Sequence, residues 1–114
     1  MRAKIGRVIA DHTSAYPDPL TLVEGEVVTV GQHDTQWPGF VWCTNADGKG
    51  GWVPDRYLTR QGEAGVINCA YTAAELTVVV DDEVTILKEE SDWAWCLHLN
   101  GDAGWVPLDN LKCD

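Results

Sequence analysis

Positive charge is scarce in this sequence. Its 114 residues include 8 Lys and Arg against 18 Asp and Glu, which gives a net charge of −10 at pH 7. An acidic chain is repelled by phosphate backbones and by anionic lipid surfaces, so nucleic-acid binding and membrane-surface binding are disfavoured. A basic peptide or the basic face of another protein is the partner that this charge attracts, unless the charge serves only solubility.

Long apolar runs and long helical patterns are missing as well. No segment approaches the roughly 18 apolar residues of a membrane span, and the amino terminus, residues 1–5, has no apolar run of signal-peptide length. No stretch of about ten residues or more has the periodicity of an amphipathic helix. We therefore expect a β-rich protein, and a reducing cytoplasm is the compartment that fits best.

The cysteines and histidines form none of the patterns of a metal site or a catalytic site. The four cysteines show no C-x-x-C spacing and no paired histidines at ligand distances, which disfavours a zinc site. No candidate nucleophile recurs beside a base, so we expect no catalysis, no cofactor and no metal. The residues concerned are Cys43, Cys69, Cys96, Cys113, His12, His33 and His98.

What the sequence does contain is a tandem repeat. The segments Gly51–Pro54 and Gly104–Pro107 both read Gly-Trp-Val-Pro and lie 53 residues apart. Each copy follows a Trp-Cys pair and a glycine at the same distances, so the shared pattern is Trp-Cys, a short polar turn and Gly-x-x-Gly-Trp-Val-Pro. Further upstream the copies match at larger offsets, which places extra residues of the first copy in loops.

The repeat divides the chain into two small domains. We expect a first domain over residues 1–58, a linker over residues 59–64 and a second domain over residues 65–114. A domain of about 60 residues buries only about 60% of the surface that its unfolded chain exposes, so each core must be dense. The six Trp, three Tyr and one Phe supply large apolar side chains for these cores.

Short strands joined by turns account for each repeat. Runs of β-branched and alternating apolar residues favour strands, while Asp47-Gly48 and Asn100-Gly101 are typical of hairpin turns. A single helical turn is expected over Pro54–Leu58 and at the same place in the second repeat. The expected strands are Arg7–Ala10, Leu20–Leu22, Val27–Val30, Phe40–Thr44 and Gly51–Val53, followed by Gly65–Ile67, Leu76–Val80, Glu83–Leu87 and Trp95–Leu99.

This order of elements resembles the Src homology 3 (SH3) domain, of the bacterial variant type. Glu75–Val78 looks like the family's Glu-Leu-Ser-Phe element, and Glu24–Glu26 and Asp81–Glu83 look like the turn before its third strand. The two Gly-x-x-Gly-Trp-Val-Pro copies fit closely, and the match covers nearly the whole chain. The resemblance implies an all-β fold of two tandem, small, five-stranded SH3-like antiparallel barrels.

The resemblance also implies a function. The family binds extended proline-rich peptides, in the polyproline II conformation, across a groove lined by aromatic rings. Such a ligand is already rigid, so little conformational entropy is lost, and acidic loop residues pair with a flanking Arg or Lys. We therefore expect a non-enzymatic protein-interaction module that binds proline-rich or basic extended peptides.

In the first repeat, only part of the family's groove is carried over. Pro54 and Tyr57 match the groove's proline and terminal tyrosine, while the two tyrosines of the first strand correspond to Ala10 and His12. Tyr16 is a candidate replacement for the lost ring, and Asp18 lies one residue out of step with the acidic position. The candidate site residues of this repeat are His12, Tyr16, Asp18, Trp37, Trp52, Pro54 and Tyr57.

The second repeat retains a different part of the family's groove. Cys69 and Tyr71 take the two tyrosine positions, Glu75 is placed for a basic ligand side chain, and Asn110 replaces the terminal tyrosine. Counting back from Gly101 puts Ala94 in the position of the groove Trp, so that Trp93 requires a bulge and Trp95 follows one residue later. The same count puts Val41 there in the first repeat. The candidate site residues are Tyr71, Glu75, Trp93, Trp105 and Pro107.

A second interpretation comes from the missing tyrosines. Ala10, Cys69 and Asn110 replace three of the family's six groove tyrosines, and His12 replaces a fourth. The alternative function is therefore a structural or assembly protein with degenerate grooves, which uses its barrels for self-association or domain packing. The sequence specifies neither the oligomeric state nor the orientation of the two domains.

Overall fold

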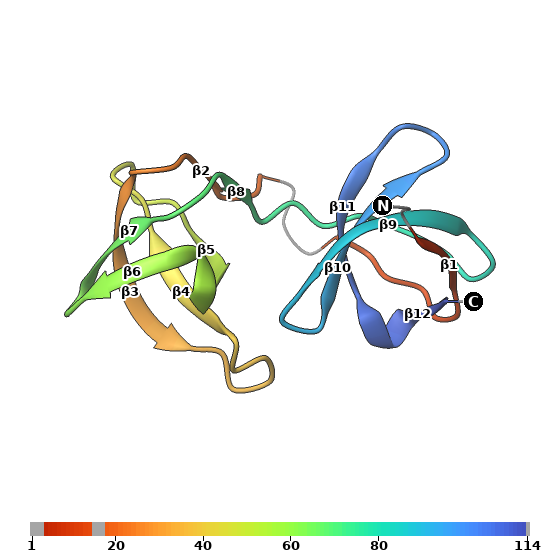
Figure 1. Cartoon of the computed structure of the whole chain (residues 1–114), viewed down its shortest axis with the longest axis horizontal. Coiled ribbons are helices and arrows are strands. Elements are labelled where there is room, and N and C mark those ends of the chain that lie inside the picture. The colour runs from red at the N-terminus through yellow and green to blue at the C-terminus, as the bar shows by residue number, and fades with distance from the viewer. Residues whose placement is uncertain (1–3, 15–17, 114) are drawn as a thin grey trace. The chain divides into compact units, whose positions relative to one another are not determined.

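The computed structural model describes residues 4–14 and 18–113, which form an all-β protein with two short 3-10 turns (Figure 1). The predicted fold class is confirmed. The strands are β1 (Lys4–Val8), β2 (Thr21–Leu22), β3 (Val27–His33), β4 (Phe40–Thr44), β5 (Gly50–Pro54), β6 (Leu58–Gln61), β7 (Ala64–Ile67), β8 (Tyr71–Thr72), β9 (Glu83–Glu90), β10 (Trp93–His98), β11 (Ala103–Pro107) and β12 (Leu111–Cys113), and the 3-10 turns are η1 (Asp55–Tyr57) and η2 (Leu108–Asn110).

The chain divides into two compact units, each with one five-stranded antiparallel sheet. Unit 1 consists of residues 1–18 and 74–114, and unit 2 is the continuous segment 19–73. The units do not coincide with the repeats over residues 1–58 and 65–114. The first strand of each repeat belongs to the unit that holds the remainder of the other repeat.

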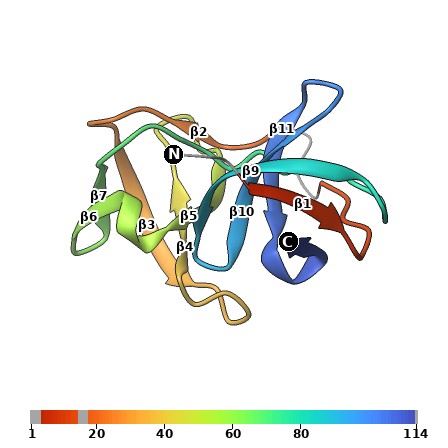
Figure 2. The ribbon, with the colours of Figure 1, turned by 45° about the vertical axis from the view of Figure 1, so that its right-hand side comes forward.

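The sheet of unit 1 has the strand order β11-β10-β9-β1-β12, so the N-terminal strand lies between two strands of the second repeat. Gly6 is opposite Val84 of β9 and opposite Cys113 of β12. In Figure 1, β1 at the red end of the colour scale lies among cyan and blue strands, and Figure 2 shows β1 running alongside β9. The first and last strands of the chain are therefore neighbours.

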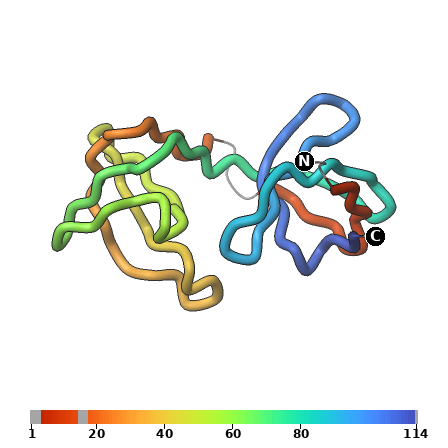
Figure 3. Tube along the Cα trace, viewed as in Figure 1, coloured from red at the N-terminus to blue at the C-terminus, as the bar shows by residue number. Residues whose placement is uncertain are grey.

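The sheet of unit 2 has the order β5-β4-β3-β7-β6, in which β7 comes from the second repeat. Val66 of β7 is opposite Val27 of β3 and opposite Thr59 of β6. A two-stranded sheet of β2 and β8 continues the exchange, with Leu22 opposite Tyr71. Unit 2 is thus a circularly permuted copy of the repeat, and it is inserted into the loop that follows β1 of unit 1, as the chain trace in Figure 3 shows.

The exchange has a local cause in the segment expected to be a linker. Residues 59–64 are mostly strand, since β6 and β7 are joined by Gly62 and Glu63 alone and Gln61 is opposite Ala64. Gly62 has a φ of 63°, the left-handed conformation that two-residue hairpin turns require. Closing so short a loop costs little entropy, so β7 pairs with β6 in the same sheet.

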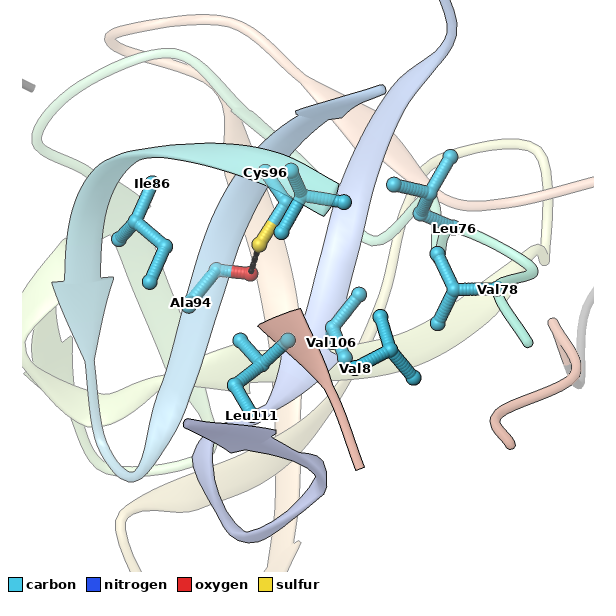
Figure 4. Close-up of a cluster of buried hydrophobic side chains, with 9 residues drawn as sticks. Val8, Leu76, Val78, Ile86, Ala94, Cys96, Val106 and Leu111 are labelled. Carbon is cyan, nitrogen blue, oxygen red and sulfur yellow. Dashed lines mark hydrogen bonds between the residues drawn. The ribbon is translucent and has the colours of Figure 1, made fainter. Parts of the chain in front are cut away.

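The core of unit 1 contains side chains from both repeats (Figure 4). Val8 of the exchanged strand is fully buried among side chains of the second repeat, and Cys96 donates a hydrogen bond to the carbonyl of Ala94 at 3.6 Å. The members of this cluster are Val8, Leu76, Val78, Val84, Ile86, Ala94, Cys96, Val106 and Leu111. In unit 2, Ile67 of the exchanged strand β7 is buried in the same way as Val8.

The glycines of the repeated motif are required for two different structural reasons. Gly48 and Gly101 have φ values of 83° and 95°, so each supplies the left-handed residue of a hairpin turn. Gly51 and Gly104 are needed for space, because a Cβ atom would lie 2.8 Å from the Leu20 side chain or 2.6 Å from the Leu76 backbone nitrogen. The motif thus combines a turn with a close approach of the chain segment that precedes β3 or β9.

One predicted strand is not regular. Residues 76–80 form no strand in the described chain and contribute only the isolated bridge of Val78 with His12. Asp11 and His12 of the first repeat lie opposite this segment, and the backbone N–H of Val80 donates to the Asp11 side chain at 2.8 Å. Among residues 4–14 and 18–113, no helix is long and apolar enough to cross a membrane.

The turn before β9 provides a test of backbone strain. Asp81 has a φ of 78° at the position where the other copy has Gly25 with a φ of 87°. A residue with a side chain is strained in this left-handed conformation, and glycine relieves that strain. Glycine also makes the unfolded chain more flexible, which offsets part of the gain, so we expect Asp81→Gly to raise the free energy of unfolding by up to about 1 kcal/mol. Gly25→Asp is the matched control and should lower it. Urea unfolding measures both, and a loss of stability in Asp81→Gly would contradict the prediction.

The cysteines should divide into two reactivity classes. Burial raises the pKa of Cys43 to about 11 and that of Cys96 to about 12, whereas Cys69 and Cys113 are exposed free thiols. At pH 7 roughly one part in ten thousand or less of each buried thiol is the reactive thiolate. We expect a thiol-reactive disulfide reagent to modify two cysteines quickly and the other two only on unfolding. The Cys69→Ser, Cys113→Ser variant should show no fast phase, and a third fast thiol would refute the assignment.

Candidate functional site

The aromatic cluster of unit 2 combines both repeats. The Tyr71 hydroxyl, on β8, donates to the backbone carbonyl of Trp52 on β5 at 2.9 Å. The rings of Tyr71 and Tyr57 meet edge to face, with centroids 5.3 Å apart and planes at 86°. Pro54 precedes η1, which positions Tyr57. A tyrosine from the second repeat therefore completes the aromatic group of the first repeat.

A cross-strand tryptophan pair lies on the same sheet. Trp42 of β4 is opposite Trp52 of β5, and their ring centroids are 5.0 Å apart in an edge-to-face arrangement. Trp37 lies half-buried in the β3–β4 connection, where its backbone N–H donates to the Asp34 carboxylate at 3.3 Å. Aromatic pairs of this geometry stabilise a sheet, and both rings of the pair are half-buried.

The equivalent place in unit 1 is polar and acidic. His12, from the N-terminal segment, contacts Glu75 of the second repeat, with 2.9 Å between Nε2 and Oε1. The His12 ring also meets the Trp93 ring edge to face, with centroids 5.6 Å apart. The His12 and Glu75 side chains are only 16% and 13% exposed, so this pair is partly shielded from water. Three segments distant in sequence thus meet in one group.

The second half of the unit 1 site lies on β10 and β11. Trp93 is opposite Pro107, and Trp95 is opposite Trp105 with ring centroids 5.3 Å apart. The Lys88 ammonium lies 5.5 Å from the centroid of the buried Trp105 ring, within cation–π range. Trp105 and Pro107 therefore form the support of this site, while Trp93 and Trp95 are only half-buried.

The register identifies the groove Trp position. Ala94 and Val41 are fully buried core residues, so neither position predicted by counting back from glycine can face a ligand. Trp93 is opposite Pro107 in unit 1, and Phe40 is opposite Pro54 in unit 2. The β10–β11 pairing is regular, and the pairing of β10 with β9, on its other side, is irregular between Trp95 and Cys96. Trp95 is opposite Lys88 and the next residue, Cys96, is opposite Ile86, so β9 has one extra residue at this point.

Phe40 is a position that the sequence reasoning missed. It takes the place in unit 2 that Trp93 takes in unit 1, since each precedes its Trp-Cys pair by the same two residues. Counting from that pair, and not from the glycine, is the signal that identifies it. Trp37, predicted as the central Trp, lies three residues before Phe40 in the longer connection of the first repeat.

The grouping of the candidate residues also differs from the repeats. His12 was predicted to share a site with Trp52 and Tyr57, but it lies in unit 1 with Glu75 and Trp93. Tyr71 lies instead in unit 2. Asp18 is exposed at the end of the N-terminal segment, and Tyr16 lies outside the described residues. The exchange of first strands is the physical reason, because His12 and Tyr71 follow the exchanged strands.

The exchange redistributes charge between the two units. Unit 1 has twelve Asp and Glu against five Lys and Arg, a net −7, and unit 2 has six against three, a net −3. The basic N-terminal strand therefore joins the acidic half of the sequence. No group of three or more His, Cys, Asp or Glu in the described part of the chain could hold a metal ion. What the two sites offer is aromatic surface with, in unit 1, a carboxylate.

Comparison with known proteins identifies the family. The family model of the variant SH3 domain matches residues 5–61 and again residues 65–114. No curated protein and no solved structure gives a significant match. SH3 domains are non-catalytic protein-interaction modules. The chain therefore belongs to the variant SH3 domain family, with two copies of the domain in one polypeptide.

Proposed function

We propose that each unit binds an extended, proline-rich peptide and that each binding site is shared between the two repeats. The observation that carries the proposal is the aromatic group of unit 2, where Tyr71 of the second repeat donates a hydrogen bond to the backbone carbonyl of Trp52 and packs on the Tyr57 ring of the first. Flat, fixed rings beside Pro54 suit a polyproline helix, which gives up little entropy when it binds.

Unit 1 suits a peptide that also carries a positive charge. Its site places the Glu75 carboxylate beside the half-buried Trp93 ring, and the unit as a whole has a net charge of −7. A Lys or Arg side chain would gain from both the carboxylate and the ring face. The preferred ligand of unit 1 is therefore a proline-rich peptide with a flanking Arg or Lys.

The alternative function, assembly through degenerate grooves, is supported by the low exposure of the tyrosines. Tyr57 is 9% exposed and Tyr71 is 6% exposed, which leaves little ring surface for a ligand. In that case the aromatic groups would serve only as packing, and the surface of the units would mediate self-association. Light scattering that shows a strict monomer at high concentration would exclude the self-association version.

A titration of the full-length protein, followed by amide and indole chemical shifts, tests the binding proposal. With Arg-flanked proline-rich peptides we expect two groups of shifted resonances, one over Trp52, Tyr57 and Tyr71 and one over Glu75 and Trp93. Peptides of the same composition with the prolines replaced by alanine are the control. A folded protein with no shift in either group would reject peptide binding in favour of assembly.

The shared construction of the unit 2 site gives a sharper prediction. Tyr71→Ala, a change in the second repeat, should weaken peptide binding at Trp52 and Tyr57 by about twofold to tenfold, since an aromatic pair contributes roughly 0.5–1.5 kcal/mol. The shifts at Trp93 should be unchanged. Tyr71→Phe keeps the ring and loses only the hydrogen bond, so it is the matched control. An effect of Tyr71→Ala confined to the resonances of Glu75 and Trp93 would show that the sites follow the repeats.

A further inference from the structure

Each five-stranded sheet holds the first strand of the other repeat in an internal position, which we call its slot. Slot 1 lies between β9 and β12 and contains β1, and slot 2 lies between β3 and β6 and contains β7. The two strands are equivalent, because Val8 is opposite Leu111 in slot 1 and Ile67 is opposite Leu58 in slot 2. The inward-facing residues of the two strands are similar, so the core does not distinguish them strongly.

The outward-facing residues of slot 1 are charged. Arg7 is opposite Glu83 of β9 on one side and Lys112 of β12 on the other. These three residues line a shallow hollow of about 350 Å³, together with Ile5 and Gly6. A cation directly opposite a carboxylate on a neighbouring strand stabilises the pairing, whereas the like charge of Lys112 opposes it, so the preference for Arg7 in slot 1 comes from its β9 neighbour.

The same row in slot 2 carries no charge. Val66 is opposite Val27 of β3 and Thr59 of β6. If the two first strands changed places, Arg7 would be opposite Val27, and Val66 would be opposite Glu83. Each interchange would replace a matched pair with a mismatched one, since β-branched pairs and opposite charges are the favourable combinations.

A second charged contact also favours β1 in slot 1. The Lys4 ammonium donates to the Glu89 carboxylate at 3.0 Å, and this hydrogen bond and the charge of Glu89 raise the pKa of Lys4. Glu63 holds the place of Lys4 ahead of β7, two residues before Gly65 as Lys4 is two residues before Gly6. With β7 in slot 1, Glu63 would face Glu89, and the attraction would become repulsion between like charges.

We propose that the two slots select their strands by these outward-facing side chains: slot 1 accepts the basic strand Lys4–Val8, and slot 2 accepts the apolar strand Ala64–Ile67. The selection makes each repeat dependent on the other, because each unit lacks an internal strand until the correct segment arrives. It is independent of peptide binding, and it goes beyond the constraint that the turn at Gly62 and Glu63 places on β7.

Disulfide trapping in the full-length protein reports which strand occupies slot 1. Ile5 is opposite Thr85, and Ala64 has the equivalent place in the other strand, opposite Thr29. The pair Ile5→Cys, Thr85→Cys therefore reports the exchanged arrangement, and Ala64→Cys, Thr85→Cys reports the sequential one. Both are made with Cys69→Ser and Cys113→Ser, which remove the exposed thiols. We expect the first pair to cross-link and the second pair not to.

The selection itself is tested by interchanging the outward-facing residues of the two strands. The fourfold variant Lys4→Glu, Arg7→Val, Glu63→Lys, Val66→Arg should raise the ratio of 64–85 to 5–85 cross-links at least several-fold. An unchanged ratio would overturn the proposal, since the short turn alone would then decide the pairing. An efficient 64–85 cross-link without the fourfold interchange would also overturn the proposal. A 5–85 cross-link between two chains would support the selection, because slot 1 would still hold the basic strand.

A milder pair of variants keeps the proposal falsifiable if the fourfold variant does not fold. In a double-mutant cycle of Arg7→Ala and Glu83→Ala, the unfolding equilibrium constant should show a coupling of up to about fivefold, the upper range for a cross-strand charge pair. The matched cycle of Val66→Ala and Glu83→Ala should show none. Equal coupling in the two cycles would overturn the proposal.

Discussion

The turn between β6 and β7 is the constraint on which the architecture depends. Only Gly62 and Glu63 separate the last strand of the first repeat from the first strand of the second. Two strands joined so closely form a hairpin in one sheet, and β7 therefore occupies an internal position of unit 2. The position that β7 would have taken in its own repeat is then filled by β1, and two similar domains become one interdependent fold.

Because of this interdependence, each candidate site contains residues of both repeats. Tyr71 and Glu75 are four residues apart, yet Tyr71 packs on Tyr57 in unit 2 and Glu75 contacts His12 in unit 1. The residues that follow each exchanged strand are carried into the opposite unit with it. The two sites consequently differ in character, since one is a tyrosine and tryptophan group and the other pairs an imidazole with a carboxylate beside a tryptophan.

Sequence alone predicts the elements of this fold better than their arrangement. The β-branched runs, the left-handed glycines and the repeated Gly-Trp-Val-Pro follow from local propensity, and most of the strands they indicate are present. Partner choice is different, because Val8 and Ile67 are equally apolar and fit the core of either unit. Besides the short turn before β7, the residues that separate them in the proposed selection are Arg7 and Lys4, whose partners are distant in sequence. Counting back from Gly101 gives Ala94, which is fully buried, whereas the candidate Trp93 lies opposite Pro107 in a regular β10–β11 pairing.

The pairing of the first strand with the last also sets an order of events during synthesis. Unit 2 is a continuous segment, so all its strands are available once Ala73 has been made. Unit 1 cannot complete its sheet until β12 emerges, because β1 lies between β9 and β12. The N-terminal strand therefore has its first sheet partner only when β9 has been made and its second only when β12 follows, although it is the first strand of the sequence to be synthesised. Its two charged side chains, Lys4 and Arg7, are of the kind that disfavours edge-to-edge pairing of an unpaired strand with another chain.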